Sequence, residues 1–430
     1  MSYRDLLAIR PFRNLWLGQA ISQLGDALYA LVFLFMVDKL TGDARMVGIA
    51  GVAQTLPFLL LSLHAGVVAD RQDRRRIMLF ADVASAIILV TFGLVLWFIP
   101  KPPVVALIGV GGALSLVNVF FAPAKSAAIP RLVPPEALST ANGLSMATQS
   151  FMPLIGMAIS GAVLGALYAI SPTYFFLSAV LLNALSFGLS AVYIRRLPPL
   201  LPDKVADSSS VSPLRQSWRD TIDGLRYMRR EHVLFVVLIL TLLFQFFVAP
   251  FMVVYVKVNR EWFGGAYATL ALCEGSFFTG MILSGIWVGR REIRRPGIAF
   301  IQGITILGLT IAAMAFSRPV GWFAFWNFVA GLGIPLAQLP MTTYIQTVVP
   351  DHFRGRVNSV LTMVSMGVQP VAIGLGGVLL EAIGPSNMLL VMGLAMAASA
   401  VAGFADRAFR TATLGDPGSY REVSDGKSDL

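Results

Sequence analysis

The chain has 430 residues, of which 56% are hydrophobic and only 13% are charged, with a formal net charge of +10. A soluble domain carries about 25% charged residues, and a single water-soluble core of this composition would leave large apolar patches exposed. The composition therefore argues against an ordinary soluble protein and favours a chain whose solvent is the lipid bilayer.

Twelve apolar runs, each long enough to cross a bilayer in about 20 residues, follow one another between charged or Pro/Gly-rich stretches. They cover residues 12–37, 46–69, 77–100, 103–123, 140–170, 172–194, 233–256, 266–288, 297–316, 320–346, 357–381 and 385–405. Links such as Lys101–Pro103 and Ser317–Pro319 are very short, so neighbouring runs are expected to form antiparallel helices. The sequence thus predicts an all-α membrane protein with twelve transmembrane helices.

Lysine and arginine are distributed unevenly between the two sets of predicted loops. With the N-terminus placed inside, the cytoplasmic segments hold 27 of the 33 basic residues and the outer loops hold six. The positive-inside rule therefore places both termini in the cytoplasm, and a bacterial inner membrane is the expected location. This topology also explains the net charge, so we expect contact with membrane lipids and no nucleic-acid partner.

The polar segments divide the chain into four predicted parts. Residues 1–195 form an N-terminal six-helix half and residues 233–405 form a C-terminal one. Between them, residues 196–232 form a cytoplasmic linker, whose stretch Trp218–Arg230 reads as a basic amphipathic helix on the anionic inner leaflet. Residues 406–430 are polar and rich in Gly, Ser and Asp, which predicts a disordered cytoplasmic tail.

The two predicted halves repeat one another. Gly66–Arg71 is echoed by Gly285–Arg290 at an offset of 219 residues, close to half of the chain length. Because each half has an even number of helices, both halves enter from the cytoplasm and share an orientation. That is the parallel-repeat pattern of secondary transporters, whose substrate site lies near the midplane between the halves.

The loop after the second predicted helix carries a distinctive pattern. It consists of Gly66, Asp70, Arg71, Asp73, Arg75 and Arg76. In this pattern the chain resembles the major facilitator superfamily, which has a second Gly at the position of Asp73. The stretches Trp16–Gln19, Pro123–Lys125 and Gly355–Ser359 are similar to the macrolide-efflux and enterobactin-exporter branch of that family. The resemblance implies a twelve-helix transporter in two pseudo-symmetric halves, expected to be monomeric, that works by alternating access.

Three carboxylates lie inside predicted spans, where a charge costs at least about 2.5–3.5 kcal/mol on insertion scales. Asp26 lies about 21 Å along the first helix, on one stripe with Gln19 and Gln23. Glu274 lies about 12 Å deep in the eighth helix. Both are candidates for the site that couples transport to protons, and the alternative for each is a structural carboxylate satisfied by neighbouring polar groups. Asp82, near the cytoplasmic end of the third helix, is expected to pair with nearby arginines and to help hold the gate.

Two explanations stay open for the arginine-rich loop. By resemblance it is a gate element: Asp70 closes the second helix, and the arginines pair with acids and with carbonyl groups at a neighbouring helix end in one gate state only. Alternatively, the arginines only follow the positive-inside rule.

Polar residues among aromatic ones predict the lining of a substrate cavity. The candidates are Gln19, Gln23, Gln54, Asn118, Gln149, Gln245, Phe247, Phe278, Asn327, Gln338 and Gln369. An apolar pocket with sparse polar groups suits bulky amphipathic molecules, although any single Phe can equally face lipid. Sugars and small anions are expected to fit poorly, because no Lys or Arg lies deep in a span.

The sequence holds no P-loop, HExxH or GxSxG motif, and one cysteine with three scattered histidines predicts neither a metal site nor a cofactor. We therefore expect no enzyme but a proton-coupled exporter of lipophilic or amphipathic small molecules, such as macrolide-like drugs. Alternatives are export of lipids or lysolipids and a non-transporting membrane receptor. Siderophore export is a further alternative, although the spans lack the cationic residues that an anionic catecholate needs.

Overall fold

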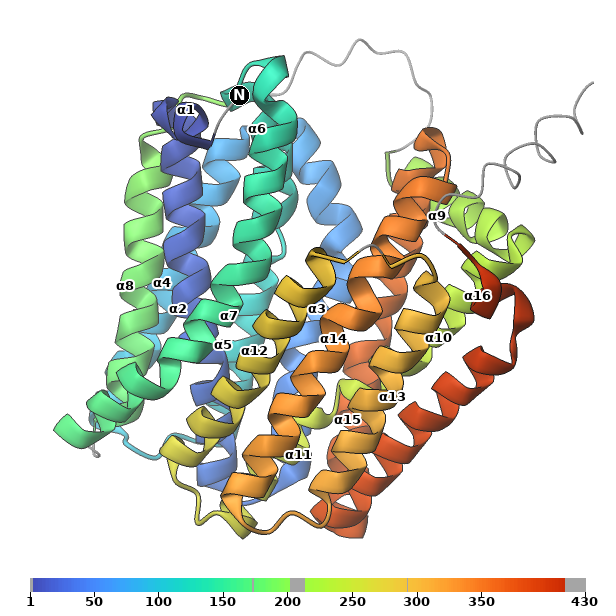
Figure 1. The fold of residues 1–430 in the computed structure, drawn as a ribbon. Helices are drawn as coiled ribbons and strands as arrows, with labels where there is room; N and C mark the ends of the chain where they lie inside the picture. The colour runs from blue at the N-terminus through green and yellow to red at the C-terminus, as the bar shows by residue number, and fades with distance from the viewer. Residues whose placement is uncertain (1–2, 172–173, 202–212, 292, 414–430) are drawn as a thin grey trace, which may run out of the picture. The chain divides into compact units, whose positions relative to one another are not determined.

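The computed structural model describes residues 3–171, 174–201, 213–291 and 293–413. Every secondary-structure element in these ranges is a helix (Figure 1), so the predicted all-α class is confirmed. Most of the helices are long and apolar, as expected where backbone polar groups must be satisfied inside lipid.

The helices follow one another closely along the chain. The earlier ones are α1 (Tyr3–Ala8), α2 (Arg10–Thr41), α3 (Ala44–Arg71), α4 (Arg74–Phe98), α5 (Val104–Asn118), α6 (Phe121–Leu132), the 3₁₀ helix η1 (Pro135–Ala137), α7 (Leu138–Ile170) and α8 (Phe175–Arg195). The later ones are α9 (Pro213–Arg230), α10 (His232–Val248), α11 (Phe251–Trp262), α12 (Tyr267–Gly289), α13 (Pro296–Met314), α14 (Val320–Val348), α15 (Asp351–Ala405) and α16 (Arg407–Thr411).

Ten described helical stretches are long and apolar enough to cross a membrane. Two of them, residues 104–132 and 232–262, each join two helices where the sequence predicts one span. The last two predicted spans both lie in α15, and Gly384, at φ 78° and ψ 167°, breaks the helical geometry between them. The predicted run 140–170 lies in α7, which is not among the ten. The count of twelve crossings therefore stays a prediction.

Short polar residues mark the turn between the first two long helices and the start of a third. Gly42 ends α2 at φ 67°, a left-handed conformation that glycine adopts without strain. Asp43 then caps α3 by accepting a 2.8 Å hydrogen bond from the backbone N–H of Arg45. Asp73 caps α4 in the same way, at 3.0 Å from the N–H of Arg75. The helix boundaries are thus encoded locally.

The described chain divides into two compact units. The first comprises Met1–Arg219, Ala249–Gly275 and Met366–Met388, and the second contains the remaining segments. The first unit therefore holds the predicted N-terminal half together with α11, the start of α12 and the middle of α15. The division into two six-helix halves joined by residues 196–232 stays a prediction.

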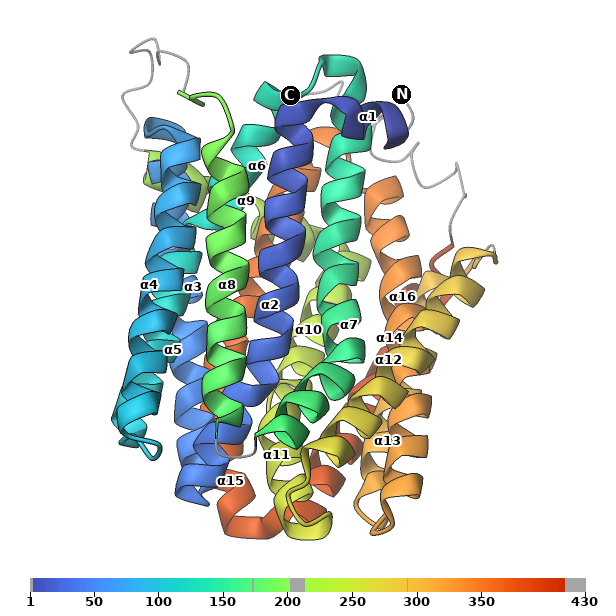
Figure 2. The ribbon, with the colours of Figure 1, turned by 90° about the vertical axis from the view of Figure 1, so that its left-hand side faces the viewer.

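In the first unit, α8 packs against both α2 and α4, and Figure 2 shows it between them. Glycine permits the close approach, because a Cβ atom on Gly25 would collide with the side chains of Ser186 and Asn183. Around the N-terminal ends of α2 and α4, a buried apolar core includes Phe12 and Met78. This core holds the helix ends that carry the arginine-rich loop.

In the second unit, α9 lies against the beginning of α15. Tyr227 stacks on Phe353 with ring centroids 4.5 Å apart, and Met228 is fully buried. A Cβ atom on Gly224 would lie 2.7 Å from the carbonyl oxygen of Arg356. The predicted helix is therefore present, but this apolar face of it is covered by protein. The expected position of this helix on the inner leaflet stays a prediction.

The predicted tail begins with a folded segment. The carboxylate of Asp406 accepts a 2.8 Å hydrogen bond from the N–H of Phe409 and lies 2.6 Å from Nε2 of His232. The hydrogen bond from Phe409 lowers the pKa of Asp406, and the contact with His232 adds to this effect. The side chain of Phe409 is fully buried. Residues 202–212 of the predicted linker and 414–430 of the predicted tail lie outside the described residues.

Candidate functional site

Asp26, the first predicted coupling acid, lies midway along α2 and is half-buried. The side-chain amide of Asn183, on α8, donates a hydrogen bond to Asp26 Oδ1 at 3.3 Å. Asn183 is itself approached by Ser186, whose hydroxyl donates to the Asn183 carbonyl at 2.8 Å. Among the described residues Asp26 forms no ion pair. A neutral amide is thus the group that holds this carboxyl.

The predicted polar stripe of α2 is deeply buried. Gln19 is 2% exposed and accepts a hydrogen bond from the hydroxyl of Ser145 at 3.4 Å. Within the described part of the chain, Gln19 Nε2, Gln23 Oε1 and Tyr29 Oη are buried without a hydrogen-bond partner. An unsatisfied buried polar group costs about 1–3 kcal/mol, so such atoms generally meet water or a ligand. Tyr29 follows Asp26 by three residues and extends the stripe, although sequence analysis did not select it.

Asp82 has a different partner from the one expected. It lies on α4 at 1% exposure, and its Oδ2 accepts a 2.6 Å hydrogen bond from the hydroxyl of Ser190 on α8. Arg75, one of the nearby arginines, instead donates to the carbonyl oxygen of Arg195 at 2.7 Å. The expected pairing is wrong because Asp82 lies two turns into α4, on the face that meets α8, whereas the arginines stand at the helix start.

Glu274, the second predicted coupling acid, lies on α12 and is 7% exposed. The hydroxyl of Tyr255, on α11, donates to the carbonyl oxygen of Leu270 at 2.9 Å, one turn before Glu274. No ion pair to Glu274 occurs among the described residues. The first compact unit therefore contains both predicted acids, and neither has a basic partner there.

The arginine-rich loop is fastened to the segment that follows α8. Asp73 Oδ1 accepts a 3.0 Å hydrogen bond from the N–H of Leu200. The N–H of Arg74 donates to the Leu200 carbonyl at 3.2 Å, and Arg75 reaches the carbonyl of Arg195. These contacts tie the start of α4 to the end of α8 and to the chain beyond it.

The other residues of the motif are less engaged. Asp70 and Arg71 are exposed, and a Cβ atom on Gly66 would meet nothing within 4 Å. The side chain of Arg76 is 87% exposed and lies 3.7 Å from Asp73. Asp73, the position at which the sequence departs from the family pattern, therefore makes the most specific contacts of the loop.

A cavity of about 240 Å³ lies in the second unit, among α10, α13, α14 and α15. Two predicted amides, Gln245 and Gln338, belong to its lining beside Phe244. The full lining is Val237, Thr241, Phe244, Gln245, Phe300, Gly303, Ile304, Leu307, Gly333, Ile334, Ala337, Gln338, Met341, Thr342, Ile345, Leu361 and Ser365. No lining residue carries a formal charge, so the cavity suits an uncharged, largely apolar group with a few hydrogen-bonding atoms.

The predicted cavity residues of the first unit are dispersed. Asn118 Oδ1 accepts a 3.2 Å hydrogen bond from the hydroxyl of Ser85. Gln54 and Gln369 are half-buried, and Gln149 is exposed. The structure does not gather these four amides around one described cavity.

Three further candidates belong to the second unit but not to the lining of its cavity. Asn327 is 2% exposed, and its amide donates to the carbonyl oxygen of Phe323 one turn earlier, at 2.9 Å. Phe278 is buried and Phe247 is half-buried. The contact of Asn327 is that of a residue that stabilises its own helix.

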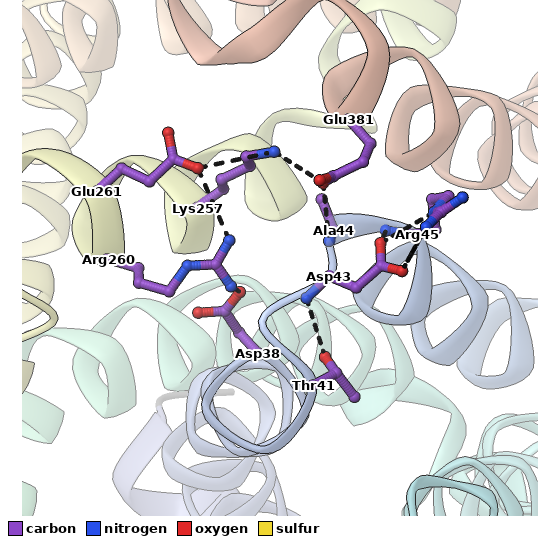
Figure 3. Close-up of polar contacts among 9 residues, drawn as sticks. All are labelled: Asp38, Thr41, Asp43, Ala44, Arg45, Lys257, Arg260, Glu261 and Glu381. Carbon is purple, nitrogen blue, oxygen red and sulfur yellow. Dashed lines mark hydrogen bonds and ion pairs between the residues drawn. The ribbon is translucent and has the colours of Figure 1, made fainter.

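A cluster of charged residues that sequence analysis missed lies in the first unit, at helix ends predicted to face outside (Figure 3). Arg260 of α11 pairs with Asp38 near the end of α2. Lys257 Nζ lies 2.7 Å from the carboxylate of Glu381 on α15. Glu261 contacts both bases, at 3.7 Å from Lys257 and 3.8 Å from Arg260. These five residues are called the charge cluster below.

The charge cluster joins distant parts of the sequence in a buried setting. Asp38 is 2% exposed and Lys257 is 5% exposed. Glu381 also accepts a 3.3 Å hydrogen bond from the N–H of Ala44 at the start of α3. The cluster therefore ties α2 and α3 to α11 and α15. Its only local signal in the sequence is the spacing of Lys257, Arg260 and Glu261 on one helix face.

The buried and half-buried carboxyls described above can take up and release protons, and the cavity of the second unit can contact an uncharged ligand. In the parts of the chain that the structure describes, no three His, Cys, Asp or Glu side chains gather as metal ligands. This arrangement suits binding and translocation of a molecule.

Residues 15–372 match the family model described as Major Facilitator Superfamily. The chain belongs to this superfamily. Macrolide efflux protein A of Streptococcus pyogenes is 26% identical to it over 385 residues, which cover 89% of this chain and 92% of the relative. The multidrug efflux pump Tap of Mycolicibacterium fortuitum is 26% identical over 396 residues, covering 86% and 90%. The predicted family is thus confirmed, and the protein is a multi-pass membrane transporter.

Solved structures show the same fold. A transporter of the POT family, crystallised with a thioalcohol-conjugated peptide, superposes with a TM-score of 0.71 at 14% identity, covering 92% of this chain and 96% of that one. A bacterial homologue of the iron transporter ferroportin, in an inward-facing state, gives a TM-score of 0.69 at 16% identity, covering 94% and 99%. At these identities the likeness shows the fold alone.

Proposed function

We propose that this transporter is a secondary active exporter that moves a bulky amphipathic molecule out of the cell in exchange for protons. The observation that carries the proposal is the pair of carboxyls Asp26 and Glu274, which lie in membrane helices without a described ion-pair partner. In a bilayer such a carboxyl must be met by a proton, a polar neighbour or water. A group that alternates between these conditions can couple proton movement to transport.

The cavity of the second unit supports the substrate class. Its amides Gln245 and Gln338 offer donors and acceptors within a largely apolar lining. At about 240 Å³ it is smaller than the ~300–1,000 Å³ of pockets for drug-sized ligands, so it would hold one uncharged part of a larger molecule. Because relatives over nearly the whole chain are a macrolide efflux protein and a multidrug efflux pump, we infer a macrolide or a comparable lipophilic drug as substrate.

The two fastened ends support alternating access. With both termini in the cytoplasm of a bacterial inner membrane, the charge cluster closes the outer end and the contact between Asp73 and Leu200 holds the inner loop. In this scheme the charge cluster breaks when the outer end opens, while the contact between Asp73 and Leu200 keeps the inner loop in place. The transporter works as a monomer surrounded by lipid.

Export of a lysolipid is the second candidate, because the uncharged lining of the cavity also suits an acyl chain. Siderophore export is disfavoured by the same lining, since an anionic catecholate needs a cation. Competition by lysophosphatidylcholine against a labelled macrolide separates the two leading substrates.

The test uses purified protein in proteoliposomes with a pH gradient and radiolabelled erythromycin as the macrolide. We expect Asp26→Asn or Glu274→Gln to abolish accumulation driven by the gradient, while exchange of labelled for unlabelled erythromycin at equal pH continues. Glu136→Gln, which neutralises an exposed acid of η1, is the matched control and should behave as wild type. If both single variants and the double variant keep full accumulation, neither acid is the coupling site.

A further inference from the structure

The helix α8 carries a polar face within an apolar sequence. Asn183, Ser186 and Ser190 fall at i, i+3 and i+7 and therefore lie on one side of the helix. They are 1%, 8% and 0% exposed. Asn183 donates to Asp26 on α2 at 3.3 Å, and Ser190 donates to Asp82 on α4 at 2.6 Å. One face of α8 thus touches two carboxyls that belong to different helices, the half-buried Asp26 and the buried Asp82.

This face forms a ribbon of polar groups between the two acids. The hydroxyl of Ser186 lies 2.8 Å from the carbonyl oxygen of Asn183 and 3.0 Å from its Oδ1. Ser190 follows one turn later. The seven residues from Asn183 to Ser190 span about 10 Å along the helix axis. Asp82 lies six residues, or about 9 Å, beyond Arg76 at the end of α4 that is predicted to be cytoplasmic.

Two glycines of α2 bring its backbone against the ribbon. A Cβ atom on Gly18 would lie 3.1 Å from the hydroxyl oxygen of Ser190, and one on Gly25 would overlap that of Ser186. Because the backbone of α2 covers both hydroxyls, they are shielded from lipid. The ribbon is therefore enclosed by α2, α4 and α8.

We propose that Ser186, Ser190 and Asp82 conduct the coupling proton between Asp26 and the cytoplasm, inside the N-terminal helices and apart from the substrate route. The assignment rests on the proposed function, and it gives Asp82 a role in coupling in place of the gate. Asn183 is a positioning residue: its amide holds Asp26 and accepts from Ser186, but it transfers no proton itself.

The transfer balances at each group. Asp26 gives its proton to a water, which passes one of its own to the hydroxyl oxygen of Ser186. Ser186 releases its own hydrogen toward Ser190 through a second water that bridges the turn between them. The hydroxyl of Ser190 takes up that proton and passes its own along the 2.6 Å hydrogen bond to Asp82. Asp82 releases a proton to water at the cytoplasmic end. Both hydroxyls are left neutral, and the net change is one proton moved.

A separate proton route has a physical purpose in an exporter of lipophilic molecules. A bulky apolar substrate displaces water from the cavity that it enters, and displaced water no longer conducts protons. A path through the helix interior lets Asp26 release its proton while substrate is bound. The buried, unpartnered atoms Gln19 Nε2 and Gln23 Oε1 on the stripe of Asp26 indicate that this region needs further polar partners, as a hydrated path provides.

The competing explanation is that these hydrogen bonds only hold the helices together. A structural bond supports every mode of transport, whereas a proton relay supports only the modes that move protons. The two explanations therefore differ in exchange of labelled for unlabelled substrate, which needs no net proton transfer.

The experiment compares Ser190→Ala, Ser186→Ala and Asp82→Asn in proteoliposomes, with radiolabelled erythromycin as the probe. The matched control is Ser284→Ala, because Ser284 is also buried and its hydroxyl donates a 2.7 Å hydrogen bond to a neighbouring helix, at Leu332. Initial rates over a range of erythromycin concentrations yield kcat and KM for accumulation driven by a pH gradient. Exchange at equal pH is measured on the same vesicles.

We expect Ser186→Ala, Ser190→Ala and Asp82→Asn each to lower the kcat of gradient-driven accumulation about tenfold or more, with KM and exchange unchanged. Ser284→Ala should leave all three unchanged. The relay is overturned if Ser190→Ala and Asp82→Asn keep the wild-type kcat, or if exchange falls as much as gradient-driven accumulation. If wild-type protein itself shows no gradient-driven accumulation, the proposed function fails, and the relay fails with it.

Discussion

Replacing Arg260 by methionine tests the charge cluster, because it removes the charge and keeps much of the side-chain volume. Asp38, the partner of Arg260, is 2% exposed and would remain buried without its guanidinium. Removing one partner of a buried ion pair costs about 3–5 kcal/mol. The cost has a ceiling, because a carboxyl with the ordinary aspartate pKa of about 3.9 can be protonated at pH 7 for about 4 kcal/mol. We therefore expect a penalty of about 3–4 kcal/mol on the state in which the cluster is assembled.

A penalty of this size changes the ratio of assembled to opened cluster about 100- to 1,000-fold, since about 1.4 kcal/mol corresponds to a factor of ten. The effect should depend on pH in a defined direction. At pH 5.5 protonation of an ordinary aspartate costs only about 2 kcal/mol, so the defect of Arg260→Met should shrink as the pH falls. A variant defect that grows at low pH would contradict this account.

Opening of the cluster can be followed by thiol labelling. In a Cys273→Ser background, a cysteine in place of Val52 is nearly isosteric and lies where α3 meets Gly374 of α15. We expect a membrane-impermeant maleimide to label it far faster in Arg260→Met than in the parent. Arg45→Met is the matched control, because Arg45 belongs to an exposed ion pair of the same turn, and exposed pairs contribute little. Unchanged labelling in Arg260→Met, or equal acceleration in the control, would refute the reasoning.

Two further changes test the packing of the first unit. Gly25→Ala should lower the thermal stability in detergent by about 1–3 kcal/mol through overpacking. Gly188→Ala is the control and should leave stability unchanged, because a Cβ atom there meets nothing within 4 Å. Equal melting temperatures of the two variants would disprove the close contact. Asp73→Gly should release the N–H of Leu200, speeding its hydrogen exchange about ten- to a hundredfold for a lost bond to a charged group of about 1.5–3 kcal/mol. Asp43→Gly is the control: it removes a helix cap that has no distant partner and should leave the hydrogen-exchange rate of the Leu200 N–H unchanged. If the Leu200 N–H stays protected in Asp73→Gly, the contact contributes nothing.

Hydropathy was sufficient to predict most of the long apolar helices, because such a helix is continuous in the sequence and its apolar character depends on each residue alone. Helix continuity was harder to predict. The runs 357–381 and 385–405 read as separate helices, yet α15 extends through both with only Gly384 outside helical geometry. Conversely, the single predicted run 103–123 contains the boundary between α5 and α6. Such breaks are one or two residues wide and hardly change a hydropathy average taken over about twenty residues.

The candidate acids were predictable for a similar reason, since the cost of a charge depends mainly on its own depth. Their partners were not predictable. Sequence proximity suggested arginines for Asp82, but the structure places it on Ser190, 108 residues away. Arg260 and Asp38 are 222 residues apart, so nothing in the sequence indicates that the two charges form a pair; they do so because the folded structure brings their helix ends together. Only the packing of helices decides which side chains face one another.

The position of Asp26, the proposed coupling acid, follows from a seven-residue spacing that recurs on both helices. Gly18 and Gly25 lie two turns apart on α2, as do Asn183 and Ser190 on α8, and seven residues return to nearly the same face of a helix. Asp26 directly follows the second glycine, so the close contact of that glycine with the side chains of Ser186 and Asn183 places the carboxyl beside Asn183. A glycine in a helix costs about 1 kcal/mol relative to alanine, and at Gly25 no larger side chain fits that contact. A chain with alanine there would keep its carboxylate and its apolar span. It would lose the approach that connects the acid to α8, so the proposed coupling requires the helix pair and not Asp26 alone.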